Sequence, residues 1–91
     1  MVYDVDFTDI ANDGLLKLKK SEQTAYQKLL RLLEELREHP LTGAGKPEPL
    51  KGDKHGRWSR RITDKHRLVY EVKGKEILVL VISVYGHYDD K

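Results

Sequence analysis

Cysteine is missing from this 91-residue chain, and long apolar runs are missing as well. Without thiols, neither a disulfide framework nor a thiolate metal site can form, which suits a reducing cytoplasm. The longest apolar run, Ile77 to Ile82, is far shorter than the roughly 20 residues that a membrane-spanning helix needs. No N-terminal segment resembles a signal peptide. We therefore expect a soluble, cytoplasmic protein with no membrane association and one domain over residues 1–91.

Several catalytic motifs are also missing. The four histidines, His39, His55, His66 and His87, lack the spacing of a zinc site. No Gly-rich loop ends in Lys followed by Ser or Thr, as a Walker-type phosphate loop does. A nucleophile elbow built around serine is not found either. We expect no metal and no cofactor, so any chemistry depends on acids, bases and fixed positive charge.

Positive charge is concentrated in one part of the chain. Residues 46–67 carry eight Lys or Arg and three Asp or Glu, a net charge of +5, whereas the whole chain carries only +2. Such a segment attracts polyanions, although a charged stretch is often only a solvated surface. Trp58 and Tyr70 are interleaved with the basic residues, which favours a phosphate-contacting surface. Trp58 itself is better interpreted as a core or sheet-face residue than as one that stacks on a base.

The N-terminal half predicts one strand followed by two helices. Residues 2–7 alternate apolar and polar side chains, as a half-buried strand does. Thr8 is a favourable N-cap for a helix over residues 9–19, and Ser21 is expected to cap a stronger helix over residues 22–38. The apolar residues that recur at helical spacing, and are expected to cover a sheet, are Ala11, Leu15 and Leu18, then Ala25, Leu29, Leu32 and Leu36.

The C-terminal half predicts a loop and three further strands. Glycine and proline are typical of a loop over residues 42–49. Three runs with strand character follow, at 56–62, 66–72 and 76–84. Their short connections predict an antiparallel meander, and the last run is apolar on both faces, which places it inside the sheet. The order β-α-α-β-β-β indicates an α+β fold, with two helices packed on one face of an antiparallel sheet and the other face free for function.

The residue types needed to cleave RNA without a metal are all present. That reaction needs a base for the 2′-hydroxyl, an acid for the leaving 5′-oxygen, and cations for the charge that develops on phosphorus. Glu48 lies between Pro47 and Pro49, which restrict its backbone. His87 and Tyr88 follow the last strand, and Tyr88 can stack on a base. The candidate cations are Lys51, Arg60, Arg61 and Arg67.

Each candidate also has an ordinary structural interpretation. Glu48 can be a loop carboxylate paired with a neighbouring lysine, and His87 can be a surface histidine near the chain end. Strand alternation places Arg60 and Arg61 on opposite faces, so both cannot contact RNA unless a bulge intervenes. On these patterns alone, a plain nucleic-acid-binding domain is favoured over a ribonuclease.

Four blocks of sequence carry a resemblance to a known family. They are GAGKPEPLK at 43–51, WSRRIT at 58–63, HRLVY at 66–70 and GHY at 86–88. In order and spacing they closely resemble the YoeB (Txe) toxins of the RelE/ParE superfamily of toxin–antitoxin systems. The resemblance implies a RelE-like fold and a ribosome-dependent mRNA endoribonuclease. It also implies cutting in the ribosomal A site, beside 16S rRNA, by metal-independent attack of the 2′-hydroxyl.

The resemblance assigns roles to six residues. The catalytic ones would be Glu48 as general base, Arg67 at the transition state and His87 as general acid. The substrate-binding ones would be Lys51 and Arg61 on phosphate and Tyr88 in placing the substrate. The implied partners are the ribosome, its mRNA and a YefM-type antitoxin, and a homodimer is left open.

Two other functions are left open. A ParE-like toxin poisons gyrase without acting as an enzyme, and that branch does not rely on this set of residues. An inactive module would retain only antitoxin binding or operator control.

Overall fold

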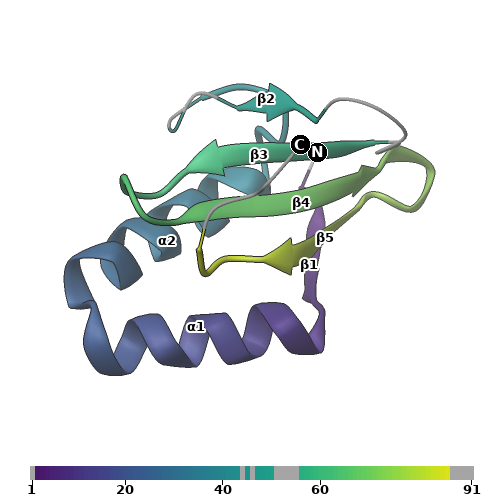
Figure 1. Ribbon diagram of the computed structural model, residues 1–91. Coiled ribbons are helices and arrows are strands. Elements are labelled where there is room, and N and C mark those ends of the chain that lie inside the picture. Colours follow the sequence, from purple (N-terminus) through teal and green to yellow (C-terminus); the bar gives the residue numbers. More distant parts are fainter. Residues whose placement is uncertain (1, 44, 46, 51–55, 87–91) are drawn as a thin grey trace.

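The computed structural model describes residues 2–43, 45, 47–50 and 56–86. Its elements, in chain order, are β1 (Asp4–Phe7), α1 (Asp9–Ser21), α2 (Gln23–Leu36), β2 (Glu48–Pro49), β3 (Arg57–Arg61), β4 (Arg67–Lys73), a 3₁₀ turn (Gly74–Glu76) and β5 (Leu78–Ser83). Figure 1 shows the two helices on one side of a twisted sheet. The predicted α+β fold is therefore confirmed.

The described strands form one sheet in the order β1-β5-β4-β3-β2. The meander of β3, β4 and β5 is antiparallel, as predicted, and β5 lies inside the sheet between β1 and β4. However, β1 pairs with β5 in parallel, so the sheet is mixed rather than wholly antiparallel. Apolar alternation shows which face of a strand is buried, but it carries no information about the direction of the neighbouring strand.

The loop predicted over residues 42–49 is partly wrong, because Glu48 and Pro49 form a short edge strand. Glu48 lies opposite Ser59 and Pro49 lies opposite Trp58 on β3. The next residue, Leu50, donates its N–H to the Arg57 carbonyl at 3.0 Å. Proline has no N–H to donate and so is typical of loops, but an edge strand tolerates it. This pairing holds Glu48 against the sheet.

The two helices are joined by a single residue. Thr8 caps α1 as predicted, since its hydroxyl accepts the Ala11 N–H at 3.1 Å. The predicted Ser21 cap is wrong: Ser21 is the last residue of α1, and Glu22 lies at the start of α2 with no side-chain cap bond. The Glu22 N–H instead bonds to the Leu18 carbonyl at 2.8 Å, which closes α1. Among the described residues, no helix is long and apolar enough to cross a membrane.

The core lies between the helices and one face of the sheet. The predicted stripes of both helices are confirmed, with Leu15 half-buried and the other predicted residues buried. Trp58 is partly buried against this core, as expected. The buried hydrophobic residues that fill it are Ala11, Leu18, Ala25, Leu29, Leu32, Leu36, Ile62, Leu68, Tyr70, Val79, Val81 and Val84.

Tyr70 and Arg60 are buried on the helix side of the sheet, which corrects two expectations. Both are completely buried, so neither can contribute to a phosphate-contacting surface. The Arg60 Nε–H donates to the Tyr70 hydroxyl at 3.1 Å, and that hydroxyl donates to the Pro40 carbonyl at 2.6 Å. Alternation along β3 had separated Arg60 from Arg61, but it did not show which of the two faced the core.

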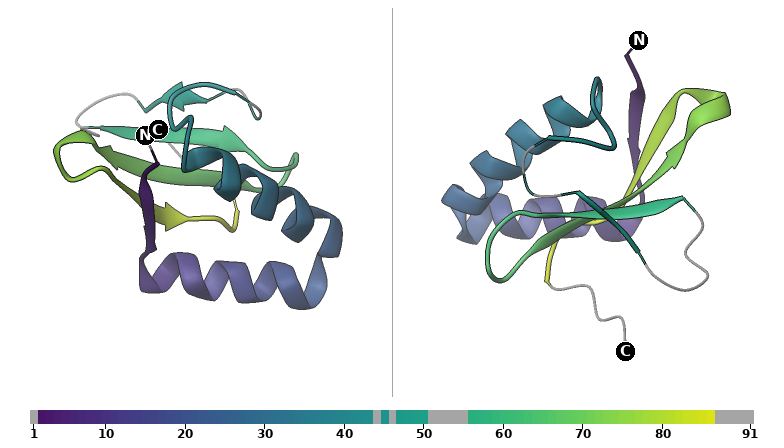
Figure 2. Two further views of the ribbon diagram at one scale, coloured as in Figure 1. Left: turned by 180° about the vertical axis from the view of Figure 1, so that it is seen from behind. Right: turned by 90° about the horizontal axis from the view of Figure 1, so that it is seen from above.

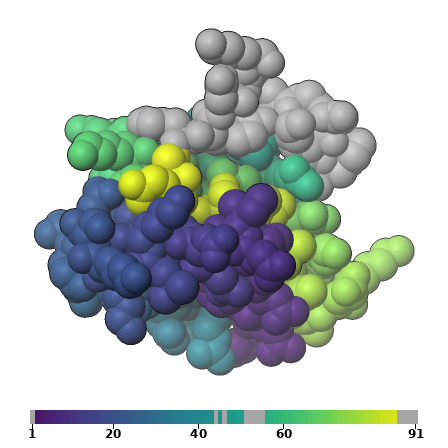
Figure 3. Space-filling view, turned by 60° about the horizontal axis from the view of Figure 1, so that its bottom comes forward, coloured from purple at the N-terminus to yellow at the C-terminus, as the bar shows by residue number. Residues whose placement is uncertain are grey.

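A glycine allows α1 to approach the end of β5 closely. A Cβ atom on Gly14 would lie 3.0 Å from the Tyr85 Cβ and 3.0 Å from a Val84 methyl group. Figure 2 shows α1 crossing beneath the sheet, and in Figure 3 the yellow residues that follow β5 lie directly beside the helix. Glycine has low helix propensity, but here it lets the chain after β5 pass over the helix.

Candidate active site

Glu48 lies on the sheet face that the helices leave open. Its strand partner is Ser59, and directly opposed residues of paired strands project to the same side of a sheet. Ser59 alternates with Trp58 and Arg60, whose side chains face the core. The Glu48 side chain is 63% exposed. A carboxylate is thus presented to solvent from a strand that the flanking prolines restrict.

Arg67 is the charged partner of Glu48. It begins β4, and its Nη1 lies 3.8 Å from the Glu48 Oε1, with the Arg67 side chain 32% exposed. The separation is that of an ion pair without a hydrogen bond, because such bonds rarely exceed about 3.2 Å. The predicted base and the predicted transition-state cation therefore lie side by side. Glu48 pairs with this arginine across β3.

Arg61 lies directly opposite Arg67 in the antiparallel pair of β3 and β4. Its side chain is 54% exposed and forms an ion pair with Asp64 in the turn between those strands. A surface pair of this kind adds little stability, so a stronger anion can displace it. On the described part of the open face, the guanidinium groups of Arg61 and Arg67 thus lie at neighbouring positions near the Glu48 carboxylate.

The remaining predicted site residues, Lys51, His87 and Tyr88, lie outside the described residues. The structure does describe Gly86, the residue just before the last two. The Arg67 N–H donates to the Gly86 carbonyl at 2.9 Å, which brings Gly86 to the start of β4. His87 follows Gly86 in the sequence, so the residue that precedes the predicted general acid lies next to Arg67.

His66 is a residue of this region that the sequence did not single out. Its side chain is 4% exposed, its Nδ1 accepts the Gly86 N–H at 2.8 Å, and its Nε2 lies 2.9 Å from the Glu22 Oε2. The Tyr85 ring packs against it, with the ring centroids 4.6 Å apart. No spacing motif could have revealed this contact, because its partners lie 20 and 44 residues away in sequence.

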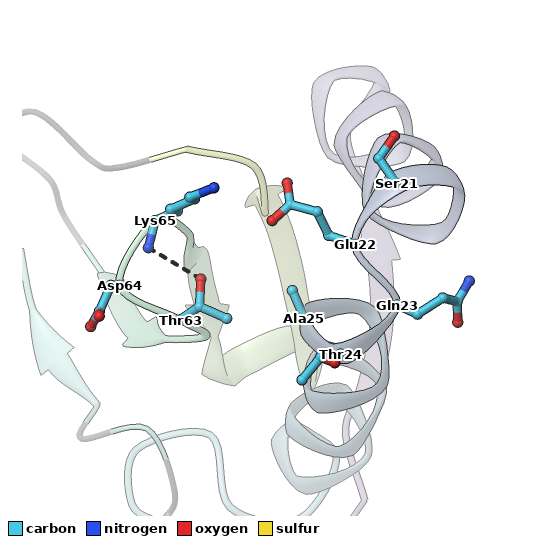
Figure 4. A pocket seen from close by; sticks show the side chains of 8 residues that line it. All are labelled: Ser21, Glu22, Gln23, Thr24, Ala25, Thr63, Asp64 and Lys65. Atoms are coloured by element: carbon cyan, nitrogen blue, oxygen red, sulfur yellow. Dashed lines mark hydrogen bonds between the residues drawn. The ribbon is translucent and has the colours of Figure 1, made fainter.

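A shallow pocket of about 500 Å³ lies on another side of the same region. Figure 4 shows it between the junction of α1 with α2 and the turn that joins β3 to β4. In that turn the Thr63 hydroxyl accepts the Lys65 N–H at 3.1 Å. Neither Glu48 nor Arg67 is among the lining residues, which are Ser21, Glu22, Gln23, Thr24, Ala25, Thr63, Asp64 and Lys65.

The described residues of the open face include a carboxylate and guanidinium groups. Within the part of the chain that the structure describes, no group of three or more His, Cys, Asp or Glu side chains could hold a metal ion. An exposed carboxylate can accept a proton from a hydroxyl, and a guanidinium can stabilise charge on a phosphate oxygen. Glu48 and Arg67 are close enough to act on one phosphodiester group.

Comparison with known proteins identifies the family. Residues 7–88 match the family model described as YoeB-like toxin of bacterial type II toxin-antitoxin system. A relative named Toxin YoeB from Mycobacterium bovis is 44% identical over 72 residues, which cover 79% of this chain and 84% of that protein.

Solved structures agree with this match. A YoeB/ParE toxin from Agrobacterium tumefaciens is 38% identical with a TM-score of 0.87, over 93% of this chain and 99% of that one. Staphylococcus aureus YoeB, solved as a dimer and in a heterotetrameric complex with YefM, is 31% identical over 97% of this chain and 100% of that one. Its TM-scores are 0.83 and 0.80. This chain therefore belongs to the YoeB-like toxins of bacterial type II toxin–antitoxin systems.

Proposed function

We propose that this chain is a ribosome-dependent mRNA endoribonuclease that cuts messages in the A site of cytoplasmic ribosomes. The observation that carries the proposal is the placement of the Glu48 carboxylate 3.8 Å from the Arg67 guanidinium on the open face of the sheet. At this separation, the base can reach the 2′-hydroxyl while the cation reaches the oxygens of the adjacent phosphate. The family, whose blocks contain both residues, supports the same assignment.

The proposed reaction needs only groups from the chain. Glu48 removes the proton of the 2′-hydroxyl, and the 2′-oxygen attacks the adjacent phosphorus. Arg67 stabilises the extra negative charge on the phosphate oxygens as the new bond forms. His87 gives a proton to the 5′-oxygen as its bond to phosphorus breaks. The products are a 2′,3′-cyclic phosphate and a free 5′-hydroxyl.

Substrate binding is assigned to cations and one aromatic ring. Arg61 lies opposite Arg67 and can grip a neighbouring phosphate with two N–H donors. Lys51 is proposed to contact phosphate as well, and Tyr88 to stack on a base. Since Asp64 pairs with Arg61 in the free protein, RNA would have to displace that carboxylate.

The proposed partners are the ribosome with its mRNA and a YefM-type antitoxin. The S. aureus relative was solved in complex with YefM and also as a dimer, which supports an antitoxin partner and a homodimeric state for this chain too. We propose that the antitoxin restrains cleavage until it is removed. Binding to antitoxin can be measured separately from cleavage, so the two parts of this proposal are independent.

The proposal is tested on purified ribosomes that hold a defined mRNA with an open A site. Wild-type protein should generate a new 5′ end at the A-site codon, and the same mRNA without ribosomes should stay intact. Glu48→Gln keeps the size of the side chain but removes its basicity, so the cleavage rate should fall by about 10²–10⁴-fold. His87→Gln should cause a loss of similar size.

Three outcomes would contradict the proposal. Undiminished cleavage by both variants would show that these residues do not have the assigned roles. Intact mRNA together with accumulating DNA breaks in expressing cells would instead indicate a gyrase-directed toxin. If expression affects neither growth nor mRNA while antitoxin binding persists, the chain is an inactive binding module.

A further inference from the structure

His66 connects the helical layer to the chain segment that precedes the proposed general acid. On one side of the ring, Glu22 at the junction of the helices lies 2.9 Å from Nε2. On the other side, the Gly86 N–H donates to Nδ1 at 2.8 Å. The ring is almost completely buried, so water does not compete effectively for either contact.

These two contacts define the tautomer of the His66 ring. A backbone N–H can only donate, so Nδ1 must carry a lone pair and no proton. The ring proton of the neutral imidazole is then on Nε2, where it donates to the Glu22 carboxylate. Glu22 thus selects the one neutral tautomer that can accept from Gly86, in the way that a carboxylate orients a histidine elsewhere in proteins.

Both polar groups of Gly86 are held by consecutive residues at the start of β4. His66 accepts its N–H, and the Arg67 N–H donates to its carbonyl oxygen at 2.9 Å. Gly86 has φ +85, a left-handed conformation that favours glycine. The position and direction of the chain are therefore restricted at the residue before His87.

We propose that His66, oriented by Glu22, is a positioning residue that sets where the C-terminal His87 begins relative to Glu48 and Arg67. The inference rests on the proposed function, in which His87 is the general acid. His66 itself does not contact the reacting atoms. It acts through Gly86, and its acceptor nitrogen, rather than its bulk, is the property that matters.

The test uses two substitutions that each keep one of the ring's two hydrogen-bonding functions, either the acceptor at Nδ1 or the donor at Nε2. In His66→Asn, the side-chain oxygen can occupy the position of Nδ1 and accept from Gly86. In His66→Gln, the amide nitrogen can reach the position of Nε2 and donate to Glu22, but nothing replaces the acceptor. Both variants are made in the full chain and compared with wild type. The measurements are the rate of single-turnover cleavage on programmed ribosomes, the KM for ribosomes, the midpoint of thermal unfolding and the exchange rate of the Gly86 amide.

We expect His66→Gln to lower the single-turnover rate by about 10–10²-fold, because small errors in the placement of a catalytic group are costly. The KM of His66→Gln for ribosomes should stay within about twofold of wild type, because substrate binding is kept. His66→Asn should retain most of the cleavage rate, because its side-chain oxygen keeps the acceptor for the Gly86 N–H. Combined with His87→Gln, His66→Gln should cause little further loss, because residues that act through one another are not additive. Equal rate losses in the Asn and Gln variants, or additive losses with His87→Gln, would overturn the inference.

Amide exchange separates failure of this inference from failure of the proposed function. In the free protein, the Gly86 amide should exchange about tenfold faster in His66→Gln than in wild type, and at the wild-type rate in His66→Asn. Equal exchange in all three proteins overturns the positioning role whether or not mRNA is cut. If the three proteins show the expected exchange pattern but wild type leaves A-site mRNA intact, the cleavage proposal fails and the role of His66 in catalysis fails with it.

Discussion

Arg60 and Glu35 form an ion pair beneath the sheet, with Arg60 Nη1 2.6 Å from the Glu35 Oε1. The arginine is completely buried, whereas the Glu35 side chain is 29% exposed. Arg60 Nη2 also donates to the Thr42 carbonyl at 2.7 Å and to the His39 carbonyl. The guanidinium thus connects β3, α2 and the chain that follows α2. One residue further along, Arg61 is exposed on the opposite face.

Replacing Arg60 tests its structural role. Arg60→Met keeps an unbranched side chain but removes the Arg60 donors from Glu35 and from two carbonyl oxygens, so the free energy of unfolding should fall by about 3 kcal/mol. Arg61→Met is the matched control on the neighbouring residue, and its stability should change by about 0.5 kcal/mol or less. Urea unfolding followed by circular dichroism measures both. Similar stability losses at the two positions would contradict the assignment.

Tyr70 should make stability sensitive to alkaline pH. Burial raises its pKa from the ordinary value of 10.0, although the hydrogen bond from Arg60 and the charge of that arginine lower it in part. Well below pH 10.0 the phenol is protonated in both the folded and the unfolded chain. As the pH rises above 10.0, only the unfolded chain ionises, so the free energy of unfolding falls until the folded pKa is passed.

The comparison of wild type with Tyr70→Phe isolates this effect, because other alkaline titrations are common to both. Urea unfolding at pH 9 and at pH 10.5 should show a smaller difference in stability between the two proteins at the higher pH. A difference that stays constant with pH would show that the Tyr70 phenol ionises alike in the folded and unfolded chain.

Gly14→Ala should destabilise the protein, although alanine is favoured in helices by about 1 kcal/mol. The new methyl group would lie 3.0 Å from Tyr85 and Val84, at the point where α1 meets the end of β5. Asn12→Ala is a suitable control, since Asn12 is exposed on the same helix and should gain stability. Thermal unfolding of both variants decides the sign, and a higher midpoint for Gly14→Ala would show that the segment can move away without cost.

Arg67 and Arg61 should differ in the step they affect. Arg67→Lys keeps the charge and the backbone bond to Gly86 but removes the planar pair of donors, so the single-turnover rate should fall by about 10²–10³-fold. Arg61→Ala should mainly raise KM, because a phosphate contact binds ground state and transition state alike. Ribosome titrations under single-turnover conditions separate the two, and a pure KM effect for Arg67→Lys would refute its role at the transition state.

Local sequence signals predicted the structure correctly where a residue could serve only one structural role at its position. Thr8 capped its helix, the apolar stripes of both helices faced the core, and the meander of three strands formed as predicted. Predictions were wrong where two structural roles were open to the same residue, such as helix cap and helix interior. Ser21 is a good cap by type, yet α1 continues through it, and Glu22 pairs with His66 rather than with a helix end.

The candidate site was predictable only in part. The family blocks identified Glu48, Arg61 and Arg67, and the structure brings these three to one face. Lys51, His87 and Tyr88 remain predictions, because they lie outside the described residues. Arg60 was counted among the candidate cations because an arginine rarely occupies a core, and Tyr70 was counted with the surface because it lies close to the basic segment.

By itself, the sequence determined the kinds of elements, the buried faces of the helices and the residue types available for RNA cleavage, since these depend on local propensity and periodicity. Only the tertiary structure decided which strand lies beside which, which arginine is buried, and that His66 bonds to both Glu22 and Gly86. Those contacts join residues far apart in the chain. They form only when packing the apolar faces has brought the elements together, so no local pattern encodes them.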